Sequence, residues 1–174
     1  MPAVRFTDQL NVQIGNELAA HNQYLACAVH YDALTMPRMA AFFYAQALEE
    51  RDHAMMMVQY LLDTDSPVVI PEVPAPRSTF ADVVEPVQLA LAQEKTVTEQ
   101  VNQLLRIARE ENDFASEQFM QWFIKEQVEE VATMSDLLAV VTRNRDDIED
   151  IEEYVDREQQ AEGADPTAPR QAGA

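Results

Sequence analysis

The sequence has few of the residues that interrupt helices or cross-link chains. Of its 174 residues only three are glycine, at Gly15, Gly163 and Gly173, and one is cysteine, Cys27. The long stretch without glycine lacks the commonest turn residue, which argues against all-β and α/β folds. One cysteine cannot form an internal disulfide. Runs of about 18 apolar residues are also absent, so we expect no membrane-spanning segment.

Basic residues are scarce as well. Lys and Arg total 12 against 31 Asp and Glu, which gives a formal net charge of -19. Such a chain repels nucleic acid and anionic membranes and favours cations, so we expect neither nucleic acid nor membrane as a partner. The N-terminus lacks the basic start and apolar run of a secretory signal, and we therefore expect a cytoplasmic protein.

What remains is a helical pattern. Apolar residues recur at spacings of three and four in four long stretches, and a shorter acidic stretch follows them. We expect the first helix to begin near Thr7 as its N-cap. The composition after residue 158 predicts a helical domain over 1–158 and a disordered tail over 159–174. The predicted helices cover residues 7–34, 37–62, 84–111, 114–142 and 146–158.

A proline-rich connector determines the predicted topology. Five of the nine prolines fall within residues 67–86. About 20 extended residues span up to about 65 Å, whereas a helix of about 27 residues is only about 40 Å long. Antiparallel neighbours need linkers of only about 2–8 residues. The second and third helices are therefore expected to run parallel, in an all-α four-helix bundle with one long crossover and a short fifth helix.

Each long helix carries a glutamate within its apolar stripe: Glu17, Glu50, Glu94 and Glu130, with His53 three residues after Glu50. At about 1.5 Å per residue the four glutamates lie in one layer within about 10 Å. Burying an unpaired carboxylate is costly, so four in one core require a multivalent cation. Glutamates with one imidazole suit a hard or borderline metal such as iron.

Together with the crossover and the fifth helix, these residues resemble a bacterial non-haem ferritin over about residues 6–158. Glu-x-x-His alone is a common motif, but the ordered set on four helices is specific. The resemblance implies a di-iron ferroxidase centre. Glu17, Glu50 and His53 would bind one iron, and Glu50, Glu94 and Glu130 the second, with Glu50 bridging.

The resemblance also implies roles for residues around this centre. Gln127 matches a position next to the ligands of the second iron, and Tyr24 matches a tyrosine that can supply an electron. A third iron site, facing the interior of a cage, is matched by Glu49, Glu126, Glu129 and Glu130. The expected assembly is a hollow cage of 24 subunits.

The implied function is iron storage. The protein is expected to oxidise Fe(II) with oxygen or hydrogen peroxide and to store ferric oxyhydroxide inside the cage. Two ferrous ions about 3.5 to 4 Å apart can each pass one electron to an oxygen molecule. A site with a single imidazole also suits a protein that must release its product, because nitrogen-rich sites retain metals more firmly.

Departures from related families limit the alternatives. Bacterioferritins carry a histidine where Glu130 stands, and a haem-ligating methionine where Arg51 stands, so no haem is expected. A di-iron peroxidase or oxidoreductase of the rubrerythrin type often carries an iron-thiolate domain, which one cysteine excludes here. A DNA-protecting miniferritin places its ligands between subunits and usually lacks the fifth helix. An acidic helical scaffold without catalysis is the remaining alternative.

Overall fold

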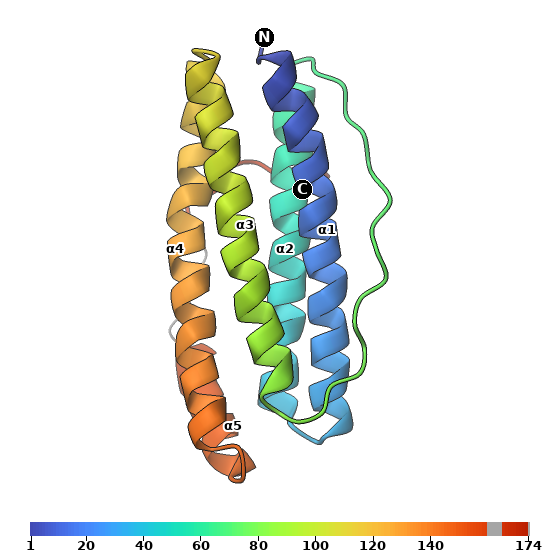
Figure 1. Ribbon diagram of the computed structural model, residues 1–174, viewed down its shortest axis with the longest axis vertical. Helices are drawn as coiled ribbons and strands as arrows, with labels where there is room; N and C mark the ends of the chain where they lie inside the picture. The colour runs from blue at the N-terminus through green and yellow to red at the C-terminus, as the bar shows by residue number, and fades with distance from the viewer. Residues whose placement is uncertain (160–164, 174) are drawn as a thin grey trace.

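The computed structural model describes residues 1–159 and 165–173, and over these ranges it contains five helices and no strands. The helices are α1 (Val4–Ala33), α2 (Pro37–Asp63), α3 (Glu85–Glu110), α4 (Phe114–Arg143) and α5 (Ile148–Gln159). Figure 1 shows the four long helices as a bundle with α5 at one end. The predicted all-α fold is confirmed. Among the described helices, none is long and apolar enough to cross a membrane.

The start of α1 differs from the prediction. The helix begins at Val4, and Thr7 donates its hydroxyl to Val4 O at 3.0 Å within the first turn, so Thr7 is not the N-cap. The N–H of Ala3 instead donates to Asp113 Oδ2 at 2.9 Å. Asp113 also caps α4, because its Oδ1 accepts from the N–H of Ser116 at 3.1 Å. One carboxylate therefore joins the starts of two helices.

The connector between α2 and α3, residues 64–84, runs along the length of the bundle (Figure 1). Helices α2 and α3 therefore run parallel, as the sequence predicts. The connector lies close to α1 at Gly15, where an added Cβ would stand 2.5 Å from Pro71 Cγ. Within the helix only glycine leaves room for this proline ring.

Two side-chain amides of α1 hold the connector, because each one donates a hydrogen bond to the connector backbone and accepts another from it. Asn11 Nδ2 donates to Pro67 O at 3.0 Å, and Asn11 Oδ1 accepts from the N–H of Val69 at 2.7 Å. Gln23 makes both bonds to a single connector residue, Arg77. Its Nε2 donates to Arg77 O at 2.8 Å, and its Oε1 accepts from Arg77 N–H at 2.9 Å. These amides satisfy backbone groups that an extended, proline-rich segment cannot pair within itself.

Three helices end in a left-handed residue that is not glycine. Thr35, Asp65 and Asn112 have φ values of 60°, 52° and 55°, directly after α1, α2 and α3. After α1, the N–H of Met36 then donates to Tyr31 O at 3.0 Å, and equivalent bonds follow the other two helices. These bonds close a Schellman motif, which satisfies carbonyls at the helix end. The turns therefore form although glycine is absent from them.

The interior of the bundle consists of two hydrophobic clusters separated by polar residues. The first cluster fills the end near the N-terminus and includes Phe6, Leu10, Met57, Leu104 and Met120. The second fills the opposite end and includes Tyr31, Met36, Phe43, Val87 and Met134. Between them, each long helix contributes buried polar side chains to what we term the polar layer. Its members are Glu17, Glu50, His53, Glu94, Gln127 and Glu130.

The C-terminal segment, residues 165–173, lies against the bundle. The N–H of Ala172 donates to Met55 O at 3.1 Å, and Trp122 Nε1 donates to Asp165 Oδ2 at 3.2 Å. The tail predicted over residues 159–174 falls partly on residues 160–164 and 174, which lie outside the described residues. The predicted domain boundary after residue 158 stays a prediction.

Candidate metal centre

The polar layer contains the five residues that the sequence predicts as ligands of two iron ions. They come from all four long helices, and none exposes more than 5% of its surface. On each helix the predicted ligand lies between residues of the two hydrophobic clusters, which fixes its depth in the bundle. The expectation of one common level for Glu17, Glu50, Glu94 and Glu130 agrees with this arrangement.

Three of these side chains converge closely enough to share one cation. One ligand atom each from Glu17, Glu50 and His53 lies within 4.8 Å of the others. His53 Nδ1 stands 3.7 Å from Glu50 Oε2. The three residues predicted to bind the first iron therefore lie together. Within the described residues, no group of this kind includes Glu94 or Glu130, so the second predicted position is more open.

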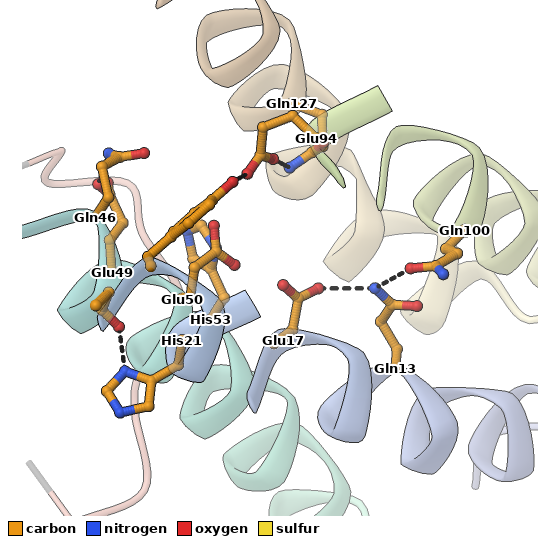
Figure 2. Close-up of polar contacts among 12 residues, drawn as sticks. Gln13, Glu17, His21, Gln46, Glu49, Glu50, His53, Glu94, Gln100 and Gln127 are labelled. Atoms are coloured by element: carbon orange, nitrogen blue, oxygen red, sulfur yellow. Dashed lines mark hydrogen bonds and ion pairs between the residues drawn. The ribbon is translucent and has the colours of Figure 1, made fainter. Parts of the chain in front are cut away.

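Glu94 is held by two hydrogen bonds in the polar layer. The Tyr24 hydroxyl donates to its Oε1 in a short hydrogen bond, and Gln127 Nε2 donates to its Oε2 at 3.4 Å (Figure 2). Thr98 Oγ1 lies 2.9 Å from Gln127 Oε1, where its hydroxyl can donate and turn the amide N–H groups toward Glu94. The structure thus places both Tyr24 and Gln127 on a predicted ligand.

Several polar atoms of this layer are buried without a hydrogen-bond partner among the described residues. They are Glu17 Oε2, both carboxylate oxygens of Glu50, Glu130 Oε2 and His53 Nε2. An ionised carboxylate in this state costs several kcal/mol, of order 3 to 5 kcal/mol for an uncompensated buried charge. A bound cation would remove this penalty, so the unpartnered atoms are what a metal site requires.

Burial raises the pKa of three carboxyl groups in this layer, those of Glu50, Glu94 and Glu130. For Glu50 the largest cause is desolvation, followed by the charges of Glu94 and Glu17. For Glu130 desolvation again comes first, followed by the charges of Glu94 and Glu49. The pKa of Glu94 is also raised by desolvation, although its hydrogen bond from Tyr24 acts in the opposite direction. Without a cation these groups compete for protons, so cation binding must release protons.

A second convergent group lies beside the first. Glu49, His53 and Glu126 bring one ligand atom each to within 4.8 Å of one another. They border a cavity of about 640 Å³, which Glu129 and Asp165 also line. Glu129 does not join the group, and its carboxylate lies 3.6 Å from Lys125 Nζ. His53 thus belongs to both groups and connects the polar layer to the cavity.

Sequence reasoning missed one buried polar residue that lies beside the polar layer. Gln13 is fully buried, and its Nε2 donates to Glu17 Oε1 at 2.9 Å. Figure 2 shows it between Glu17 and Gln100. It precedes Glu17 by four residues, and residues four apart on a helix are neighbours on one face. That spacing is the signal that could have identified it.

Comparisons with known proteins agree with this geometry. Residues 7–144 match the family model of the ferritin-like domain. The chain is 51% identical to Ferritin BfrB of Mycolicibacterium smegmatis over 97% of this chain and 93% of the relative. It is 34% identical to a bacterial non-heme ferritin of Staphylococcus epidermidis, over 79% and 83%. A solved open pore ferritin from the archaeon Archaeoglobus fulgidus superposes with a TM-score of 0.87 at 26% identity, over 94% and 100%. The chain therefore belongs to the ferritin family.

Proposed function

We propose that this protein is a ferroxidase that stores its ferric product as an oxyhydroxide mineral within a 24-subunit cage. The observation that carries the proposal is the convergence of Glu17, Glu50 and His53 among carboxylate oxygens that have no other partner. Fe(II) is the substrate, and oxygen or hydrogen peroxide is the oxidant. The names of the relatives support iron storage as the family's role.

In the proposed reaction two ferrous ions each lose one electron to an oxygen molecule. Overall, two Fe(II), one oxygen molecule and four waters give two FeOOH, one hydrogen peroxide and four protons. Glu50 has both oxygens free of hydrogen bonds, so it is the ligand suited to bridge two ions. Glu94 and Glu130 would hold the second ion after small movements of their side chains. Where only one Fe(II) is bound, Tyr24, which bonds to Glu94, would supply the second electron to oxygen, and a later Fe(II) would reduce the resulting tyrosyl radical.

We further propose that oxidised iron leaves through the cavity beside His53. Glu49 and Glu126 form the second convergent group there, and Glu129 lines the same cavity. Carboxylates bind ferric iron well, and the partial exposure of these residues allows the ion to move on toward the mineral. No haem is proposed, and the cytoplasmic location stays a prediction.

The direct test replaces the proposed bridging ligand. We expect Glu50→Ala to slow the fast phase of Fe(II) oxidation at least about 100-fold, because changes outside the ligand shell alone cost about 10- to 100-fold. Stopped-flow absorbance of the ferric product measures this rate. Glu99→Ala, which removes an exposed carboxylate of α3 near Glu94, is the matched control and should oxidise iron normally. Equal rates in Glu50→Ala and wild type would refute the assignment.

The alternatives differ in assembly and in product. Size-exclusion chromatography with light scattering should give the mass of 24 chains for the cage, of about twelve for a miniferritin, and of a monomer or dimer for a di-iron peroxidase. Electron microscopy after aerobic loading with Fe(II) should then reveal electron-dense cores. An assembly of the right mass that forms no core would contradict storage while leaving oxidation open.

A further inference from the structure

We propose that Gln13 is a positioning residue of the metal centre, which holds Glu17 so that it offers a single oxygen to the cation. The inference rests on the proposed function, because it takes Glu17 to be a ligand. It assigns a role to a side chain that touches no metal itself.

Hydrogen bonds engage both ends of the Gln13 amide. Its Nε2 donates to Glu17 Oε1 at 2.9 Å and to Gln100 Oε1 at 3.0 Å, and its Oε1 accepts from Asn16 Nδ2 at 2.9 Å. An ionised carboxylate can only accept, so the N–H side of Gln13 must face Glu17. Figure 2 shows the chain from Glu17 through Gln13 to Gln100. The amide cannot flip without losing these bonds.

The two oxygens of Glu17 consequently differ. Oε1 is occupied by Gln13, whereas Oε2 is buried and has no partner among the described residues. Oε2 is the oxygen of Glu17 with all its lone pairs available, and the hydrogen bond to Oε1 holds Glu17 for binding through Oε2. Glu50 accepts no hydrogen bond from a described side chain. Each oxygen of Glu94 accepts one hydrogen bond, from Tyr24 or Gln127, and keeps a lone pair for a metal ion.

The chemistry of the donor suits a cation site. An arginine or lysine would also hold Glu17, but its positive charge would repel the metal ion. An amide satisfies the carboxylate oxygen without adding charge. Among the described residues, the side chains that donate hydrogen bonds to Glu17 and Glu94 are uncharged. They are Gln13, Gln127 and Tyr24. The polar layer thus keeps its negative charge for the incoming ion.

The test measures binding of Co(II) to the assembled protein by titration calorimetry and by d–d absorption. In Gln13→Leu we expect affinity at the centre to fall about 10- to 100-fold, as for other losses of an outer hydrogen bond to a ligand. We also expect weaker d–d absorption, because a released Glu17 can bind through both oxygens and raise the coordination number. The spectrum reports on ligand geometry, which a purely structural role of Gln13 would not change.

Gln23→Leu is the matched control. Gln23 is also a buried glutamine of α1, but it bonds the connector at Arg77 and not a ligand. This variant should lower the thermal stability and leave both cobalt affinity and spectrum unchanged. Gln13→Asn is a second variant that keeps a buried amide but is one methylene too short to reach Glu17, and it should behave like Gln13→Leu.

Glu17→Ala distinguishes a failure of the proposed metal centre from a failure of the proposed role of Gln13. If Glu17→Ala binds Co(II) like the wild type, Glu17 is not a ligand and the proposed centre itself is wrong. If Glu17→Ala weakens binding while both Gln13 variants match the wild type in affinity and spectrum, the centre stands and the role of Gln13 is overturned. The expected outcome is a loss in all three variants, with Gln13→Leu adding nothing further in the Glu17→Ala background.

Discussion

Glu50 illustrates what a buried ligand requires of its protein. Both of its oxygens lack a hydrogen-bond partner among the described residues, and the side chain is 1% exposed. Without a cation, desolvation shifts the equilibrium of this group toward its protonated form. Proton and metal compete for the same oxygens, which links the stability of the metal-free protein to pH.

This linkage predicts how Glu50→Gln behaves in the absence of metal. Burial raises the pKa of Glu50 in the folded state. Its contribution to stability is then fully present below the unfolded pKa of about 4.3, and is lost as pH rises through the higher folded pKa. We therefore expect the Tm of Glu50→Gln minus that of the wild type to increase as the pH rises above about 4.3. Calorimetry in a chelating buffer measures it.

Added Zn(II) provides the control for this experiment. It should raise the Tm of the wild type more than that of Glu50→Gln, since a ligand that binds only the folded state stabilises it. The groups outside the metal centre are the same in both proteins, so their titration cancels in the difference. A difference that does not change with pH would mean that Glu50 is not titrating in its buried position.

The candidate ligands could be identified from the sequence because a carboxylate in an apolar stripe is visible there. Glu17, Glu94 and the Glu50–His53 pair stand at the depth expected from helix lengths alone. Gln13 stands four residues before Glu17, so spacing could have identified its contact with Glu17, but not its bond to Gln100 on another helix. Thr98 could not be predicted, because its role depends on the distance to Gln127 on another helix, which spacing does not give.

At the scale of the elements, the contact of the connector with α1 yields a stability prediction. Alanine favours helices over glycine by about 1 kcal/mol, so Gly15→Ala would stabilise an isolated helix. Here the added Cβ would stand 2.5 Å from Pro71 Cγ, and overpacking of this kind costs about 1–3 kcal/mol. We therefore expect Gly15→Ala to lower the Tm. Differential scanning calorimetry of the assembled protein measures the change.

The double variant Gly15→Ala with Pro71→Ala tests the cause. Removing the ring should relieve the clash, so the double variant should lose less stability than the two single losses added together. Simple additivity would mean that the two residues do not interact and that Gly15 has another role.

Helix positions were predictable, but the details of helix ends were not. The periodicity of apolar residues places all five helices correctly, and the prolines reveal the crossover. The cap expected at Thr7 was wrong because α1 begins about one turn earlier, at Val4, with Ala3 as its N-cap. Asp113, far along the chain, accepts from the N–H of Ala3. The turn built on Thr35 also carries little sequence signal, since a β-branched residue seldom adopts a left-handed conformation.

For the whole molecule, the net charge of -19 predicts a salt dependence. A strongly acidic protein raises the local concentration of cations and speeds their arrival, and salt screens this effect. At limiting Fe(II), we expect the initial oxidation rate to fall several-fold between about 10 mM and about 200 mM NaCl. At saturating Fe(II), the rate should barely change, because arrival no longer limits it. If the rate depended equally on salt at limiting and at saturating Fe(II), salt would be acting on the oxidation step and not on the arrival of the ion.

The two hydrophobic clusters and the polar layer are made of different residues, so the residues that stabilise the fold are separate from the candidate ligands. The residues that exclude water lie above and below the carboxylates, on the same four helices, and none of them is a ligand. Small zinc domains unfold when their ion is removed, because the metal supplies most of their folding energy. Here the two clusters supply stability without any contribution from the polar layer, so we expect the bundle to stay folded when a metal ion binds and when it leaves.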